Sequence, residues 1–129
     1  MTTRRSALAY LVDTSVVTRV WRQPVLDALR PRTWQIGRPT VIDIEIGYSA
    51  RNADEWDRLA DRLDAFASVD IEAHHLRRAG QVQRMLADAG LRGRSVPDLI
   101  IAACAEDYGL TVLHYDADFD HIAAVTGQR

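Results

Sequence analysis

The chain of 129 residues has a single cysteine, Cys104, and no lysine at all. One cysteine cannot form an intramolecular disulfide, so a fold held together by disulfide bonds is excluded. Cys104 lies inside an apolar run, which indicates a small core residue rather than a nucleophile. All 16 basic residues are therefore arginines. Their planar guanidinium groups suit phosphate binding.

Long hydrophobic runs are also missing, since none approaches the ~20 apolar residues needed to cross a bilayer. The N-terminal segment 1–6 is followed by a short strand-like run and not by the apolar region of a signal peptide. We therefore expect a cytoplasmic protein with no membrane partner. The length predicts one domain over residues 1–129. A net charge of -2 does not by itself mark a nucleic-acid-binding protein.

Several catalytic and metal-binding motifs are absent. The sequence has no GxGxxG motif, no Gly-Lys-Ser/Thr phosphate loop and no HExxH pattern. A phospho-receiver domain would need a lysine that this chain does not have. None of the four histidines has the context of a zinc finger. His74 and His75 are expected on a solvated helix face.

Strand and helix patterns alternate along the chain. Short apolar runs predict strands at residues 8–12, 33–36, 68–71 and 111–114. Apolar residues at helical spacing predict helices at residues 14–21, 25–29, 52–66, 72–89, 96–108 and 118–125. In 52–66 and 72–89 the apolar stripes include Trp56 and Leu76. The alternation predicts an α/β domain with a mostly parallel sheet.

Residues 40–50 fit two structures equally well. Alternation with a period of two over residues 42–46 favours a strand, whereas Thr40 followed by Asp43 is typical of a helix capping box. The local pattern does not decide between them.

Four acidic residues occur where apolar segments end or turn: Asp13, Glu45, Asp98 and Asp116. A carboxylate in an apolar setting costs several kcal/mol unless it is paired or binds a metal. Asp13 and Asp116 each follow a predicted strand, and ligands of parallel sheets bind beyond the carboxyl ends of the strands. The four acids therefore predict a divalent-cation site.

Each acid also has a simpler explanation. Asp13 could be the N-cap of the helix that follows it, and Asp98 completes the capping pattern of Ser95. Asp116 could belong to a turn, and Glu45 could be an ordinary surface residue. The four together favour the metal site more strongly than any one of them does.

The order of these motifs resembles the PIN-domain ribonucleases, and specifically the VapC-type toxins of bacterial toxin–antitoxin pairs. The resemblance rests on LVDTS at residues 11–15, Glu45, VPDLIIAA at residues 96–103, and HYDADF at residues 114–119. It covers nearly the whole chain and implies a three-layer α/β/α fold with a mostly parallel sheet. It also implies that residues 40–50 form a helix carrying Glu45.

The same resemblance implies an acidic Mg²⁺ or Mn²⁺ site that cleaves RNA phosphodiester bonds. By matched position Asp13, Glu45 and Asp98 are the core acids and Asp116 is the fourth, with Asp13, Asp98 and Asp116 holding the cation. The expected accessory residues are Ser15 and Asp118, with Asp120 as an alternative to Asp118.

Similar proteins form homodimers and are inhibited by a cognate VapB-type antitoxin. The chain departs from them in two ways. His114 stands where Thr or Ser is common, and the sequence stops where similar proteins usually continue into a final edge strand. We therefore expect an exposed strand edge.

An acidic site that accepts RNA needs basic residues nearby. Arg92 and Arg94, just before Asp98, are the expected phosphate contacts, with Arg19 and Arg22 as second choices. Two alternative functions remain open. The chain could be a non-catalytic interaction module whose acids cap helices, or a metal-dependent phosphodiesterase that acts on DNA.

Overall fold

A computed structural model of the chain describes residues 7–18, 27–91, 95–114 and 117–128. In this part of the chain, the strands β1 (Tyr10–Val12), β2 (Ile36–Pro39), β3 (Ala67–Val69) and β4 (Thr111–Leu113) form one sheet. Its order is β3-β2-β1-β4, and every neighbouring pair is parallel. The predicted α/β class with a parallel sheet is confirmed.

The register of the central strand aligns the ends of its neighbours. Tyr10 of β1 lies opposite Ile36 of β2 on one side and opposite Thr111 of β4 on the other. Because all strands run the same way, the segments that follow them emerge at one edge of the sheet. We call this edge, where β1, β2 and β4 end, the carboxyl edge.

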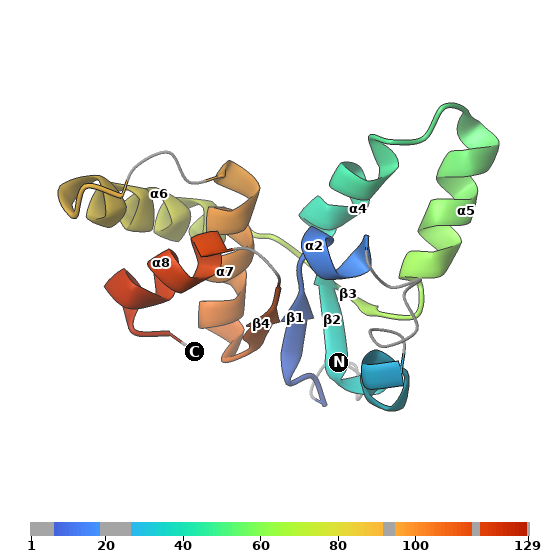
Figure 1. Ribbon diagram of the computed structural model, residues 1–129, viewed down its shortest axis with the longest axis horizontal. Coiled ribbons are helices and arrows are strands. Elements are labelled where there is room, and N and C mark those ends of the chain that lie inside the picture. Colours follow the sequence, from blue (N-terminus) through green and yellow to red (C-terminus); the bar gives the residue numbers. More distant parts are fainter. Residues whose placement is uncertain (1–6, 19–26, 92–94, 115–116, 129) are drawn as a thin grey trace.

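Helices cover both faces of the sheet and give the three-layer arrangement that the resemblance implied. Figure 1 shows α6, α7 and α8 on one side and α2, α4 and α5 on the other. Their bounds are α2 Thr14–Val17, α4 Thr40–Gly47, α5 Ala53–Leu63, α6 Ala73–Asp88, α7 Val96–Tyr108 and α8 Ala117–Thr126. None of the described helices is long and apolar enough to span a bilayer.

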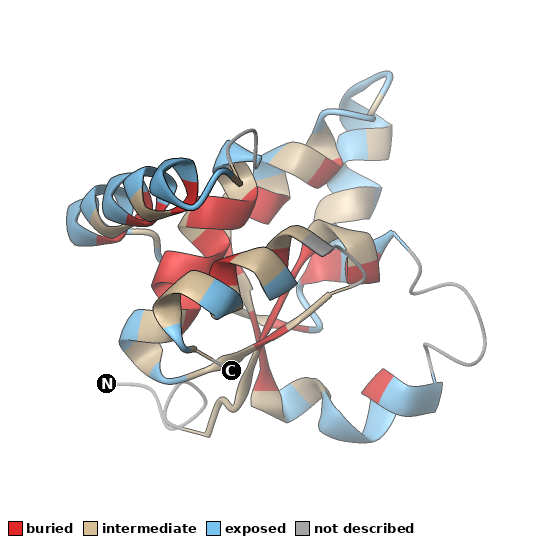
Figure 2. Cartoon of the chain, turned by 60° about the vertical axis from the view of Figure 1, so that its left-hand side comes forward, coloured by how far each residue is buried: buried red, intermediate tan, exposed pale blue. Residues whose placement is uncertain are grey.

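Helix α7, predicted at residues 96–108, is the most deeply buried of the described helices. Buried residues gather in the strands and in this helix (Figure 2), and Cys104 within it is fully buried as expected. The helix ends at Gly109, whose φ of 67° is left-handed backbone that glycine adopts without strain.

The strand predicted at residues 33–36 is wrong, because a 3-10 helix occupies Arg30–Gln35 and the strand begins at Ile36. Pro31 lies in the first turn of that helix, where proline is well tolerated. Arg38 then fixes β2 by donating from Nη1 to the carbonyl oxygen of Leu63 at 2.8 Å. These contacts connect distant segments, which a local pattern does not reveal.

The ambiguous segment 40–50 is helical, as the resemblance implied, and forms α4. The predicted capping box is absent, because Pro39 is the N-cap and makes no side-chain cap bond. Instead Thr40 Oγ1 accepts a hydrogen bond from the Ile71 amide at 3.4 Å, and Asp43 pairs with Arg38 at 3.0 Å. These partners hold α4 against β2 and the segment after β3.

The helices predicted at residues 52–66 and 72–89 are confirmed with shorter bounds, since α5 ends at Leu63 and α6 begins after Glu72. Two side chains of their predicted apolar stripes are exposed, Trp56 at 47% and Leu76 at 52%. His75, expected on a solvated face, is only 1% exposed. The predicted stripe of α6 otherwise faces the core, since Ala79, Val82 and Leu86 are buried and only in the first turn does His75 lie inward in place of Leu76.

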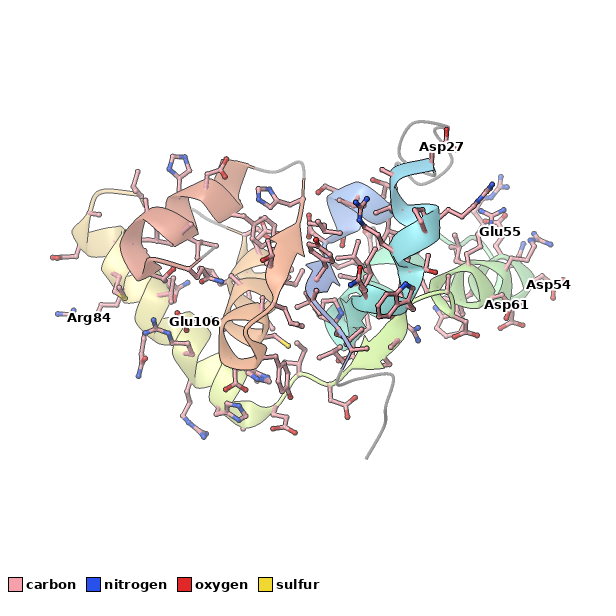
Figure 3. The ribbon with its side chains drawn as sticks, turned by 90° about the horizontal axis from the view of Figure 1, so that it is seen from below. Asp27, Asp54, Glu55, Asp61, Arg84 and Glu106 are labelled. Atoms are coloured by element: carbon pink, nitrogen blue, oxygen red, sulfur yellow. The ribbon has the colours of Figure 1, made fainter. Side chains whose placement is uncertain are left out.

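The remaining predictions differ by a few residues. Strand β3 covers Ala67–Val69, where residues 68–71 were predicted, and β1 lies within the predicted 8–12. Residues 14–17 and 27–29 are helical, while residues 19–26 lie outside the described part of the chain. Figure 3 shows Asp54, Glu55 and Asp61 of α5 pointing away from the sheet, so acidic residues lie on the outer face of this helix.

Two glycines predict opposite effects of an added methyl group. A Cβ at Gly37 in β2 would lie 2.7 Å from Val69 Cγ2 and 2.9 Å from Leu8 Cδ1, whereas a Cβ at Gly80 in α6 would meet nothing within 4 Å. We expect Gly37→Ala to lower the free energy of unfolding by about 1–3 kcal/mol through overpacking. Gly80→Ala should raise it by about 0.5–1 kcal/mol through helix propensity.

Urea denaturation of both variants beside the wild type measures these differences. Gly80→Ala is the matched control, because it adds the same methyl group at an exposed helical position. Equal midpoints for the two variants would contradict the packing described around Gly37.

Candidate active site

Asp13 occupies the carboxyl edge directly after β1 and is only 3% exposed. Its Oδ2 accepts hydrogen bonds from the Ser15 amide at 3.1 Å and the Ser15 hydroxyl at 2.6 Å. Its own amide donates to the carbonyl oxygen of Leu113 at 3.0 Å, which joins the ends of β1 and β4. Asp13 is therefore the N-cap of α2, and that role also fixes its carboxylate in place.

Glu45 reaches the same edge from α4. The Thr14 hydroxyl donates to Glu45 Oε1 at 2.8 Å, so a residue directly after Asp13 connects α2 to α4. Burial raises the pKa of Glu45 above its usual value, and the negative charge of Asp13 raises it further. The bond from Thr14 acts in the opposite direction because it stabilises the ionised form.

Asp98 lies in the first turn of α7 and is 6% exposed. Helix α7 leads through Gly109 and Leu110 into β4, so it runs back along the sheet and begins at the carboxyl edge. Its first turn therefore lies at the end of the sheet where β1 and β4 finish. Ser95 makes no side-chain cap bond to α7, so the proposed capping pattern is not formed.

Asp118 at the start of α8 contacts the N-cap residue of α7. Its Oδ2 accepts a hydrogen bond from the Ser95 amide at 3.4 Å. Asp120 points elsewhere: its side chain is 78% exposed, and its carboxylate lies 4.0 Å from His114 Nε2. His114 packs its ring on Phe119 with centroids 4.8 Å apart. The geometry thus favours Asp118 over Asp120 as the acid near α7.

Some predicted site residues lie outside the described part of the chain. These are Asp116 and the arginines Arg19, Arg22, Arg92 and Arg94. Their roles stay predictions from the sequence.

The carboxylates at the carboxyl edge offer oxygen ligands that are largely shielded from solvent. In the part of the chain that the structure describes, no basic side chain forms an ion pair with Asp13 or Glu45. Their partners are the hydroxyls of Ser15 and Thr14. Such carboxylates fit a hard divalent cation, since Mg²⁺ prefers carboxylate and water oxygens.

Sequence reasoning gave Thr14 no role, although its hydroxyl positions Glu45. Hydroxyl residues after an acid are common caps, and nothing local indicates a partner 31 residues away. The contact becomes visible only once α2 and α4 are placed side by side by the sheet.

The profile of the PIN domain matches residues 10–125 of the chain. Ribonuclease VapC51 of Mycobacterium tuberculosis (strain ATCC 25618 / H37Rv) is 53% identical over 124 residues, which cover 95% of this chain and 90% of that protein. The relative is thus similar along nearly its whole length.

Two solved structures have the same fold at low sequence identity. The DNA-bound VapBC complex from Salmonella typhimurium superposes with a TM-score of 0.77 at 18% identity, covering 95% of this chain and 96% of that chain. A toxin–antitoxin complex from Klebsiella pneumoniae gives a TM-score of 0.73 at 19% identity, covering 94% and 96%. With the profile match and the 53% identity to VapC51, the chain belongs to the PIN-domain family and, within it, to the VapC group.

Proposed function

We propose that the protein is a metal-dependent endoribonuclease that cleaves RNA phosphodiester bonds, acting in the cytoplasm as the toxin of a toxin–antitoxin pair. The observation that carries this proposal is the burial of Asp13 and Asp98 at one edge of the sheet, beside Glu45, whose pKa is raised by burial and by the charge of Asp13. The relationship to a protein named ribonuclease VapC51 supports RNA as the substrate.

Asp13, Asp98 and Asp116 would hold Mg²⁺ or Mn²⁺, directly or through water. When bound, the cation would lower the pKa of a coordinated water and offset the charge that develops on the phosphate. The protein's part is to keep these oxygens in place, which Ser15 does for Asp13 through two hydrogen bonds.

Glu45 suits the handling of a proton. Thr14 engages Oε1, which leaves Oε2 to orient the attacking water and accept its proton. A carboxyl whose pKa is raised toward the working pH is a better base than one at its usual value. Arg92 and Arg94 would contact phosphates of the RNA, in keeping with their sequence position before Asp98.

A VapB-type antitoxin is the proposed protein partner, together with a second copy of the chain. The Klebsiella and Salmonella neighbours are toxin–antitoxin and VapBC complexes. Two exposed apolar side chains also lie one turn apart on α4 and its C-cap, Ile44 at 75% and Tyr48 at 92%. Exposed apolar area of this kind favours a protein contact beside Glu45.

The first test of the site removes one charge at a time. We expect Asp13→Asn and Asp98→Asn to abolish Mg²⁺- or Mn²⁺-dependent cleavage of total cellular RNA while leaving the fold intact. Asparagine caps helices about as well as aspartate, so Asp13→Asn should keep α2. Asp61→Asn on the exposed face of α5 is the control for charge alone and should cleave like the wild type.

Full activity in both variants would sink the proposal. Loss of thermal stability together with retained antitoxin binding, and no cleavage by the wild type, would instead support an interaction module. Cleavage of DNA at the same rate as RNA of the same sequence would favour the more general phosphodiesterase.

Ionised Glu45 should lower the stability of the metal-free protein and support cleavage. Because the pKa of Glu45 is raised in the folded state, its ionised form lowers the free energy of unfolding of the metal-free protein at neutral pH. This loss disappears as the pH falls through the raised pKa and Glu45 becomes protonated. Glu45→Gln, neutral at every pH, should therefore melt at a higher temperature than the wild type at pH 7 in a chelator. The difference should shrink on acidification, while cleavage falls by about 10²-fold or more.

Differential scanning calorimetry over a range of pH, with cleavage assays on the same samples, measures both effects. A Glu45→Gln variant that melts at or below the wild-type temperature at pH 7 would contradict the electrostatic picture of the site.

A further inference from the structure

Three metal-ligating side chains meet where the start of α6 packs against the end of α7. His74 and His75 lie in the first turn of α6, and Asp107 lies in the last turn of α7. The Nε2 atoms of both histidines lie 2.9 Å from the same oxygen, Asp107 Oδ2. One ligand atom from each residue lies within 4.8 Å of the other two. We propose that His74, His75 and Asp107 form a second cation site, specific for Zn²⁺, separate from the acidic site.

The donor set decides the class of metal. Two imidazole nitrogens and one carboxylate oxygen suit zinc, which binds nitrogen and oxygen at about 2.0–2.2 Å in tetrahedral geometry. Mg²⁺ prefers oxygen ligands throughout and binds such a set weakly. Three protein ligands leave a fourth position for water, and His74 and Asp107 are open to solvent with side chains 47% and 43% exposed.

Two of the three distances between ligand atoms require only a small rearrangement. Ligand atoms around a tetrahedral zinc lie about 3.3 Å apart at these bond lengths. The observed 2.9 Å between each imidazole nitrogen and the carboxylate oxygen is a few tenths of an ångström shorter. Zinc binds an imidazole only through a nitrogen without a proton, so protonation of the rings competes with it and its binding should weaken as the pH falls.

His75 shows what binding displaces. Its Nδ1 accepts a hydrogen bond from the Glu72 amide at 2.9 Å, so in the metal-free protein the ring proton is on Nε2. Coordination through Nε2 moves the ring proton to Nδ1 and breaks that bond at the start of α6. This exchange weakens the site, and it also gives zinc binding a specific spectroscopic mark.

The surroundings hold the ligands in position. Glu72 Oε2 lies 3.5 Å from His74 Nδ1, where a carboxylate commonly orients a metal-bound histidine. Both histidines lower the pKa of Asp107 by hydrogen bonding, so its carboxylate is ionised at neutral pH. The ring of Tyr108 packs edge-on against His75, with centroids 5.3 Å apart.

A neighbouring ion pair joins the same two helices. Arg78 of α6 donates to Glu106 of α7 through Nε at 2.7 Å and Nη2 at 3.0 Å. Figure 3 places Glu106 at the boundary of the two helices. The backbones that carry the three ligands are thus already fixed before a cation binds.

The site is distinct from the acidic one. Asp98 and Asp107 lie at opposite ends of α7, nine residues and about 14 Å apart along its axis. The carboxyl edge offers carboxylates and hydroxyls, whereas this end offers imidazoles. Variants at one end therefore leave the other untouched.

Zinc titration of the full chain, purified without a histidine tag and stripped with chelator, tests the proposal. Isothermal titration with Zn²⁺ in excess Mg²⁺ should show one zinc per chain in the wild type. His74→Gln and Asp107→Asn should bind at least about tenfold more weakly. Both replace exposed side chains, so they should fold even where a change at His75 does not.

The matched controls are Asp98→Asn at the acidic site and His121→Gln on α8, and both should bind zinc like the wild type. Zinc should raise the melting temperature by about 2–5 °C in the wild type and the controls only. Nitrogen-15 spectra should show the His75 proton moving from Nε2 to Nδ1. Equal affinity in His74→Gln and the wild type, or zinc binding lost only in Asp98→Asn, would overturn the proposal, as would an absence of zinc binding to the wild type.

Discussion

Burial of the carboxylates that the sheet brings together is the constraint on which the candidate active site depends. Parallel strands deliver Asp13 to the carboxyl edge, and α4 and α7 deliver Glu45 and Asp98 to the same edge. Burial makes each charge more costly and strengthens its effect on its neighbours. Burial is the main cause of the raised pKa of Glu45, and the negative charge of Asp13 adds to it. Hydroxyl donors from Ser15 and Thr14 offset part of this cost without neutralising the charge, which keeps the oxygens able to bind a cation.

The features that sequence predicted best are those decided by neighbours along the chain. The buried helix 96–108 with its glycine stop, the central strand before Asp13 and the polar outer face of α5 all follow from local spacing. The helix at residues 40–50 did not, since its pattern was equally good for a strand. For this segment the family resemblance decided between helix and strand, because it carries information about the whole fold.

The predictions that were wrong share a different cause. Strand β2 begins at Ile36 because it pairs with β1 and β3 and because Arg38 reaches the carbonyls at the end of α5. His75 can be buried because both of its ring nitrogens have hydrogen-bond partners, the Glu72 amide and the Asp107 carboxylate. From the sequence pattern alone, a histidine on a helix is predicted to face solvent. Its actual environment is set by the facing helix.

The two ends of helix α7 differ in chemistry. Asp98 starts the helix, where the positive end of the helix dipole favours a carboxylate, and Asp107 ends it, where the dipole disfavours one. At that second end two histidines from α6 donate to the carboxylate and lower its pKa despite the dipole. Asp107 at the end of α7 thus has imidazole partners, whereas Asp98 at its start lies at the edge where hydroxyls support the carboxylates of Asp13 and Glu45. The imidazoles are what separate the two ends, because nitrogen ligands suit zinc and bind Mg²⁺ only weakly.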